Sequence, residues 1–210
     1  MNKKELISQI KQKRSFLCIG LDSDLRRIPQ HLLDYDDPIF EFNKQIIDAT
    51  QEFCVAYKPN IAFYEKMGAK GWVSLQKTVE YIPSNIFTIA DAKRGDIGNT
   101  SKHYAHSIFN QFGFDAITIS PYMGSDAIIP FTQDKAKGVF VLCLTSNKSA
   151  TEFQFITENN NHVYEIVAKN IQTLNESNNL GLVVGATNKK QMSSLREKTQ
   201  GLSWLIPGIG

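Results

Sequence analysis

Cysteine is scarce in this sequence, with three among 210 residues. Cys18, Cys54 and Cys143 each lie in an apolar stretch, and none has the close spacing that is typical of metal ligands. An odd and low number of cysteines argues against a disulfide scaffold and predicts reduced, buried thiols. Reduced thiols are typical of the cytoplasm, which is the location we expect for this protein.

The sequence also lacks an excess of charge and a long apolar segment. The 23 basic and 21 acidic residues give a net charge of +2, which argues against nucleic acid as a partner. No apolar run approaches the roughly 20 residues that cross a membrane, so no membrane partner is expected. Residues 1–14 have no apolar centre of a secretory signal, and their pattern predicts a short amphipathic helix.

Short apolar runs recur along the chain with a clear rhythm. A length of 210 residues and a hydrophobic content of 42% suit one globular domain, which we take as residues 1–210. The runs that predict strands are residues 16–22, 54–60, 87–93, 116–122, 138–145, 180–186 and 204–210. Helices are predicted between them, over residues 38–53, 100–112, 126–135, 162–175 and 188–198. Residues 61–82 read as two helical pieces that are broken at Gly68 and Gly71.

Alternating strands and helices with almost continuously apolar strands indicate a parallel sheet covered by helices. Two architectures fit this α/β pattern, an open doubly wound sheet and a closed TIM-type (β/α)8 barrel. Polar residues lie at the carboxyl ends of at least four predicted strands. In a barrel the carboxyl ends of all strands face the same opening, so this pattern favours the barrel. The sequence has one strand and one helix fewer than a complete barrel, because the chain stops at a glycine-rich segment, Pro207 to Gly210. We therefore expect a barrel that lacks its last strand and helix.

The segment from Ile89 to Thr100 carries the clearest chemical signal. It places Asp91, Lys93 and Asp96 at D-x-K-x-x-D spacing, directly after an apolar run. If residues 87–93 form a strand, Asp91 and Lys93 share one face at its carboxyl end, where ligands of parallel sheets bind. A structural salt bridge of Lys58 with Asp91 is the alternative explanation. Two acids and two bases at adjacent strand ends favour a functional array instead, which needs no metal.

These residues resemble the orotidine 5′-monophosphate decarboxylase family, in its long bacterial form. The resemblance covers nearly the whole chain and is most specific in the segment from Asp91 to Thr100. Further matching stretches are Cys18–Asp22, Ala56–Asn60, Ser120–Gly124, Leu144–Asn147 and Ile206–Gly210. The D-x-K-x-x-D spacing alone also occurs in sugar-phosphate decarboxylases and synthases of the same superfamily. Lys58 on the preceding strand and the following D-I-x-x-T pattern strengthen the match.

The resemblance implies an enzyme, a carboxy-lyase of pyrimidine biosynthesis that makes uridine 5′-monophosphate without a cofactor or metal. Lys93 would neutralise the charge that develops at C6 of the pyrimidine and donate the proton. Asp91 would crowd the departing carboxylate, and Lys58 would hold Asp91 ionised. Lys58 and Asp22 would both reach the ribose of the nucleotide.

The resemblance further implies a homodimer with the site at its interface. Asp96 would enter the site from the neighbouring subunit as a catalytic residue, with Ile97 and Thr100 near the ribose. The remaining residues implied in substrate binding are Ser146 at the pyrimidine amide and Pro207, Gly208 and Gly210 at the phosphate. From the residues alone, a helix-capping role for the Ser146 hydroxyl is equally reasonable.

One departure from the family pattern concerns the phosphate. The glutamine and arginine that grip the phosphate in the family follow the Pro-Gly-x-Gly segment, and the sequence stops at Gly210. We therefore expect weak catalysis by these 210 residues. Two other functions stay open, a metal-dependent sugar-phosphate decarboxylase or aldolase, and a non-catalytic nucleotide-binding barrel. The first needs a carboxylate where Lys58 stands, which argues against it.

Overall fold

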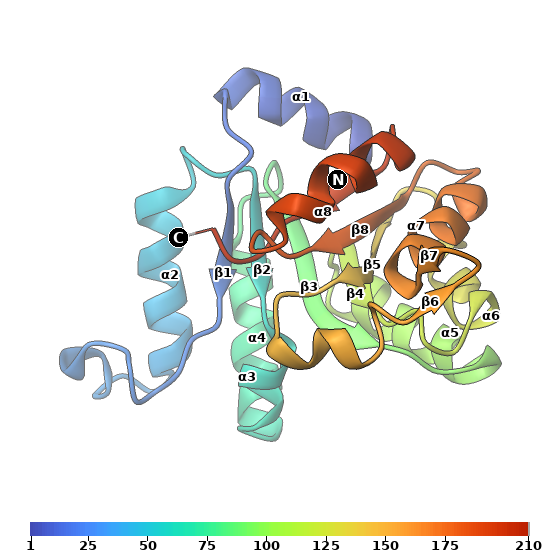
Figure 1. The fold of residues 1–210 in the computed structure, drawn as a ribbon. Helices are drawn as coiled ribbons and strands as arrows, with labels where there is room; N and C mark the ends of the chain where they lie inside the picture. The colour runs from blue at the N-terminus through green and yellow to red at the C-terminus, as the bar shows by residue number, and fades with distance from the viewer. Residues whose placement is uncertain (210) are drawn as a thin grey trace. The chain divides into compact units, whose positions relative to one another are not determined.

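The computed structural model describes residues 1–209 and divides into two compact units. The first unit comprises residues 1–92 and 106–117, and the second comprises residues 93–105 and the chain from residue 118 onward. Each predicted apolar run overlaps a strand, and Figure 1 labels the strands from β1 to β8. The chain passes between the units within β3 (Phe87–Arg94) and within β4 (Ala116–Ile119), so these two strands contribute to both.

In the first unit, β1 (Cys18–Leu21) pairs in parallel with β2 (Ala56–Pro59), and β2 pairs in parallel with β3. The register places Gly20 opposite Lys58, and an isolated bridge places Asn60 opposite Asp91. Along β2, Tyr57 is fully buried in an apolar cluster with Leu21, and its hydroxyl donates to the Ile47 carbonyl of the helix layer at 3.2 Å. Since neighbouring side chains of a strand point to opposite faces, Lys58 projects away from these helices.

The helices of the first unit match most of the predicted ones. They are α1 (Lys3–Lys13), α2 (Pro38–Thr50), α3 (Ile61–Glu65) and α4 (Ala69–Tyr81), with short turns η1 (Gln30–Leu32) and η2 (Ser107–Gln111). α2 begins at Pro38 because the Asp37 carboxylate accepts the Phe40 N–H at 3.1 Å and proline suits the first helical position. α4 packs against both α2 and α3.

The predicted break at Gly71 is wrong, because Gly71 lies inside α4 and only Gly68 precedes the helix. A Cβ atom at Gly71 would lie 1.8 Å from the Tyr64 carbonyl oxygen of α3. The glycine therefore permits the close approach of α3 and α4 and does not end a helix. Backbone proximity between two helices has no signature in a single sequence.

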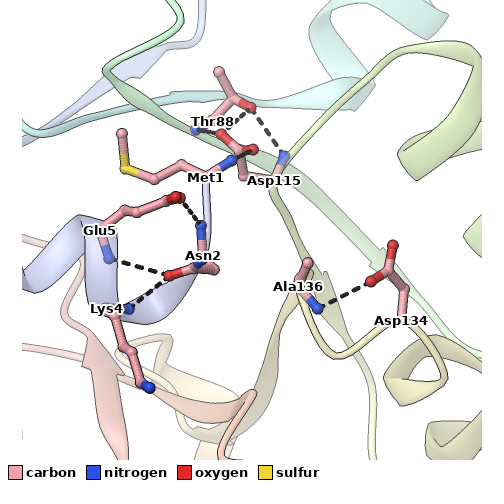
Figure 2. Close-up of polar contacts among 8 residues, drawn as sticks. All are labelled: Met1, Asn2, Lys4, Glu5, Thr88, Asp115, Asp134 and Ala136. Atoms are coloured by element: carbon pink, nitrogen blue, oxygen red, sulfur yellow. Dashed lines mark hydrogen bonds and ion pairs between the residues drawn. The ribbon is translucent and has the colours of Figure 1, made fainter.

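A polar network holds the N-terminal helix against the sheet of the first unit (Figure 2). Asn2 caps α1 by accepting the Lys4 and Glu5 N–H groups at 2.9 and 3.1 Å. The amino group of Met1 forms an ion pair with Asp115, whose other carboxylate oxygen accepts the Thr88 N–H at 3.0 Å. Asp115 thus ties α1 to β3 and to the residue before β4. Elsewhere in Figure 2, the Asp134 carboxylate accepts the Ala136 N–H at 2.9 Å in a local turn of the second unit.

In the second unit, β5 (Gly138–Leu144) pairs in parallel with β8 (Leu180–Val184), which pairs in parallel with β9 (Ser203–Leu205). α7 (Val163–Leu174) covers β5 and β8 and contacts α8 (Lys189–Lys198). The unit also contains most of α5 (Gly98–His106) and the short elements α6 (Ser125–Ile128), η3 (Ile129–Thr132) and η4 (Lys148–Glu152). The antiparallel hairpin of β6 (Thr157–Glu158) and β7 (Asn161–His162) was not predicted.

Two predicted helices differ from the observed ones in length and type. The helix expected over residues 126–135 is a single α-turn followed by the 3-10 turn η3, because Pro130 has no N–H to continue the α-helical pattern. The helix expected over residues 100–112 is α5, which begins at Gly98 and continues as the π-helical turn η2. The second difference lies at the ends of an element, where a sequence pattern is least informative.

Strand order decides between the two architectures that the sequence allowed. In the first unit the order is β1-β2-β3-β4, and in the second it is β4-β5-β8-β9. Neighbouring strands therefore follow one another along the chain, without the reversal of order that defines a doubly wound sheet. This order confirms the predicted α/β class of the (β/α)8 type. Within residues 1–209, we find no helix of the length and apolar character that a membrane crossing requires.

Candidate active site

Lys58 forms the centre of a charged cluster at the carboxyl ends of β1, β2 and β3. Its ammonium nitrogen lies 2.8 Å from Asp91 Oδ2 and 3.9 Å from Asp22 Oδ1. The side chains of Lys58 and Asp91 are only 15% and 11% exposed, whereas that of Asp22 is 43% exposed. The structure thus brings together three of the predicted site residues, with one cation between two carboxylates. A largely buried lysine remains charged in such a place because its partners are anions.

The surroundings of Lys58 change its acidity and that of a neighbouring thiol. Burial by itself lowers the pKa of Lys58, but the Asp91 carboxylate and the weaker influence of Asp22 together outweigh it, so the pKa is raised above its usual value. Lys58 is therefore an ammonium at neutral pH and cannot serve as a base there. Burial raises the pKa of the Cys18 thiol to about 12, so the thiol is protonated and unreactive at neutral pH.

Asn60 belongs to this cluster although we did not predict it as a site residue. Its amide nitrogen donates to Asp22 Oδ2 at 3.1 Å, and its amide oxygen accepts the Ala62 N–H at 3.3 Å. The second contact makes Asn60 the N-cap of α3. The Asn60 side chain therefore caps the N-terminus of α3 and also positions the Asp22 carboxylate. The sequence signal is an asparagine two residues after Lys58, within the matching stretch Ala56–Asn60.

A buried amide supports the segment that carries Asp22. Asn43 of α2 is fully buried, and its amide nitrogen donates to the Tyr64 hydroxyl at 2.9 Å and to the Thr78 hydroxyl at 3.0 Å. Ser23, next to Asp22, donates its hydroxyl to the Asn43 oxygen at 2.5 Å. The Tyr64 hydroxyl in turn donates to the carbonyl of Leu21 at 3.2 Å. This network holds the backbone on both sides of Asp22.

We expect the substitution Asn43→Leu to reduce the free energy of unfolding by about 2–4 kcal/mol, because it removes the acceptor of the Ser23 hydroxyl and the amide donor that the buried Tyr64 and Thr78 hydroxyls share. Urea unfolding followed by circular dichroism measures this loss. The control is Gln45→Leu on the exposed face of the same helix, for which a change within about 0.5 kcal/mol is expected. A loss below about 1 kcal/mol for Asn43→Leu would show that the network is not important for stability.

The second unit contains the remaining charges of the D-x-K-x-x-D segment. Lys93 lies near the end of β3 with an exposed side chain and a φ angle of +48°. Its N–H donates to the Thr118 hydroxyl of β4 at 3.0 Å. Because this φ is left-handed, simple alternation along the strand does not determine the direction of the Lys93 side chain. The predicted common face of Asp91 and Lys93 therefore stays a prediction.

Asp96, Ile97 and Thr100 lie between β3 and the first turn of α5. The Asp96 carboxylate accepts the N–H of Ile97 at 2.8 Å, and the buried Ser101 hydroxyl donates to the Asp96 carbonyl. These contacts order the turn and leave Ile97, which is 55% exposed, and Thr100 at the surface. The segment thus presents an acid, an apolar side chain and a hydroxyl together on the second unit.

Ser146 lies exposed in the loop that follows β5. The Gln154 side chain holds the preceding residue, Thr145. Its amide oxygen accepts the Thr145 N–H at 2.8 Å, and its amide nitrogen donates to the Thr145 hydroxyl at 2.7 Å. The Asn188 amide also donates to the Thr145 carbonyl at 3.1 Å. Gly185 permits the loop to approach, because a Cβ there would lie 3.0 Å from the Cβ of Ser146. Ser146 is thus set by its neighbours, and its hydroxyl shows no capping bond among the described contacts.

The expected phosphate segment follows β9. The Pro207 carbonyl accepts the Ala186 N–H at 2.9 Å, which attaches the segment to the loop after β8. Gly208 has a φ angle of +91°, which favours glycine over other residues. Gly210, the third residue predicted here, lies outside the described residues.

The comparison with family models decides the classification of this chain. The model of the orotidine 5′-phosphate decarboxylase / HUMPS family matches residues 15–210. The chain belongs to this family. The match includes the strands that carry Lys58, Asp91 and Lys93, so the resemblance inferred from the sequence is confirmed.

Curated relatives and solved structures agree with this membership. A protein of Flavobacterium johnsoniae named orotidine 5′-phosphate decarboxylase is 51% identical, and one of Bacteroides fragilis with the same name is 49% identical. Both matches cover 100% of this chain and 78% of the relative. The structure of Leishmania donovani OMP decarboxylase matches with a TM-score of 0.90 and 40% identity, over 98% of this chain and 79% of that one.

Proposed function

We propose that this chain catalyses the decarboxylation of orotidine 5′-monophosphate to uridine 5′-monophosphate, a carboxy-lyase reaction, without a cofactor. The observation that carries the proposal is the ion pair of Lys58 with Asp91, at 2.8 Å on adjacent strands. A metal-dependent enzyme of this superfamily would need a carboxylate in place of that ammonium. Family membership and relatives named for this reaction support the same conclusion.

In the reaction, the bond between C6 and the carboxylate carbon breaks and carbon dioxide leaves. The electron pair of the bond remains on C6, and no cofactor takes it up. Lys93 supplies an ammonium that offsets this negative charge and then transfers its proton to C6. The neutral Lys93 amine regains a proton from solvent. The protein contributes fixed charge and one proton, and it undergoes no net change.

Asp91 and Lys58 have complementary roles in this proposal. Asp91 faces the substrate carboxylate, and two like charges 4 Å apart repel by about 4 kcal/mol at an effective dielectric constant of 20. Loss of carbon dioxide relieves that repulsion. Lys58 keeps Asp91 ionised while the substrate binds, and its raised pKa keeps the lysine charged at neutral pH.

The remaining predicted residues bind the nucleotide. Asp22 and Lys58 contact the ribose, Ser146 contacts the pyrimidine amide, and the segment from Pro207 to Gly210 cradles the phosphate through backbone N–H groups. We also propose that the protein is a cytoplasmic homodimer in which Asp96, Ile97 and Thr100 act on the site of the second copy. The exposure of Ile97, a large apolar side chain, fits a position at such an interface.

The test is the loss of the ultraviolet absorbance of orotidine 5′-monophosphate, measured on this chain with enzyme in excess so that a single turnover suffices. We expect conversion to uridine 5′-monophosphate at equal rates with and without EDTA. Conversion that EDTA abolishes would indicate a metal-dependent reaction. Binding of uridine 5′-monophosphate without any turnover would instead support a non-catalytic nucleotide-binding protein.

A further inference from the structure

The backbone at Lys93 adopts a conformation that lysine rarely takes. Its φ angle of +48° lies in the left-handed region, where a side chain with a Cβ is strained. Such strain persists where surrounding contacts hold it, and it is frequent at functional positions. A contact within the second unit is therefore expected to hold Lys93 in this conformation.

Thr118 of β4 supplies that contact. Its hydroxyl oxygen accepts the Lys93 N–H at 3.0 Å, and its side chain is 1% exposed. The flanking side chains of β4, Ile117 and Ile119, are fully buried, which leaves Thr118 as the single polar side chain of that strand. Because Thr118 is almost completely buried, its hydroxyl offers the Lys93 N–H an acceptor that is shielded from water.

The next residues return to main-chain pairing. The Ser120 N–H donates to the Arg94 carbonyl at 2.7 Å, which is a main-chain contact between the two segments. A Cβ at Gly95 would lie 3.3 Å from the Ser120 Cβ, which brings the two segments close together. A side-chain oxygen thus accepts the Lys93 N–H just before regular contacts between the two segments resume.

We propose that Thr118 is a positioning residue for Lys93 in the reaction proposed above. Its hydroxyl holds the Lys93 N–H and thereby the left-handed turn of the backbone. That turn sets the direction in which the lysine leaves the strand, and so the place of the ammonium relative to C6. Thr118 does not touch the substrate, and it acts only through Lys93. The inference rests on the proposed decarboxylation.

The decisive variant is Thr118→Val, which keeps the shape of the side chain and removes the hydroxyl. We expect kcat to fall by about 10- to 100-fold with KM for orotidine 5′-monophosphate unchanged within about threefold, because misplacing a catalytic group by an ångström has an effect of this size. Thr118→Ser keeps the oxygen, and its kcat should stay within about threefold of the unsubstituted chain.

Thr88→Val is the matched control. The Thr88 hydroxyl is also buried on a strand and also accepts a main-chain N–H, that of Asp115, at 3.0 Å (Figure 2). Its removal should lower the thermal stability as much as Thr118→Val does, and leave kcat within about threefold. An equal fall of kcat in both valine variants would assign the effect to general destabilisation and overturn the proposal.

Hydrogen exchange of the Lys93 amide, followed by NMR, gives a readout that does not depend on activity. We expect protection of this amide to fall at least about tenfold in Thr118→Val and to be retained in Thr118→Ser and Thr88→Val. Unchanged protection, or lost protection with unchanged kcat, would overturn the role of Thr118. Absence of turnover by the unsubstituted chain would instead refute the proposed decarboxylation, whatever the amide shows.

Discussion

Replacing Lys93 with alanine is expected to reduce the single-turnover rate on orotidine 5′-monophosphate by about a thousandfold or more. The substitution removes both the proton donor and the positive charge near C6, which account for about 10²- to 10⁴-fold and about 10²- to 10³-fold in other enzymes. The exposed side chain of Lys93 makes a general loss of stability from this change small. The rate is measured by ultraviolet absorbance with enzyme in excess.

A second variant separates the two roles of Lys93. Lys93→Arg retains a positive charge, but a guanidinium does not release its proton at neutral pH. If proton donation matters, Lys93→Arg should be nearly as slow as Lys93→Ala. Lys169→Ala, which removes an exposed lysine of α7, serves as the control and should leave the rate unchanged. A rate for Lys93→Ala within tenfold of the unsubstituted chain would refute the assigned role.

Breaking the ion pair of Lys58 with Asp91 is expected to have a large effect on stability. Lys58→Met leaves the Asp91 carboxylate, 11% exposed, without the ammonium 2.8 Å away, and should reduce the free energy of unfolding by about 3 kcal/mol. Asp91→Asn should act in the same direction by about 2 kcal/mol. The double variant should be no less stable than Lys58→Met alone, because the uncompensated charge is then removed.

Urea unfolding of the four chains gives the coupling energy directly. The control is Lys77→Met, which breaks a 3.3 Å contact with Asp37 made by a lysine that is 47% exposed, and for which a change below about 1 kcal/mol is expected. Additive effects of Lys58→Met and Asp91→Asn would mean that the two side chains do not stabilise one another. Activity should be lost in all three site variants, since Asp91 and Lys58 both act in the proposed reaction.

The same pair predicts a dependence of stability on alkaline pH. The pKa of Lys58 is raised in the folded chain, so its contribution is complete below the pKa of an unfolded lysine, about 10.4. The contribution is lost as the pH rises through the higher folded value. The stability difference between the unsubstituted chain and Lys58→Met should therefore be constant near neutral pH and shrink above about pH 10.5.

Much of the fold and of the candidate site could be predicted from the sequence. Apolar runs at regular intervals indicated every strand of the parallel sheet, because buried strands need continuous apolar residues. The polar residues that end these runs indicated Lys58, Asp91 and Asp22, since a charge directly after a buried strand has few places to lie. The family pattern around Lys93 and Asp96 then indicated one reaction among those that a (β/α)8 fold supports.

Only the tertiary structure decided the features that depend on contacts between distant parts of the chain. Gly71 looked like a helix end and is a contact point of α3 and α4, because the neighbouring carbonyl leaves no room for a Cβ. Asn60 and Asn43 are ordinary polar residues in sequence, and contacts with residues 20 or more positions away make them supports of Asp22. The left-handed backbone of Lys93 and its acceptor Thr118 follow from the packing of two strands, whose sequences contain no glycine or proline at that point. A periodic pattern records which residues are buried, whereas only the packed chain determines which group each of them meets.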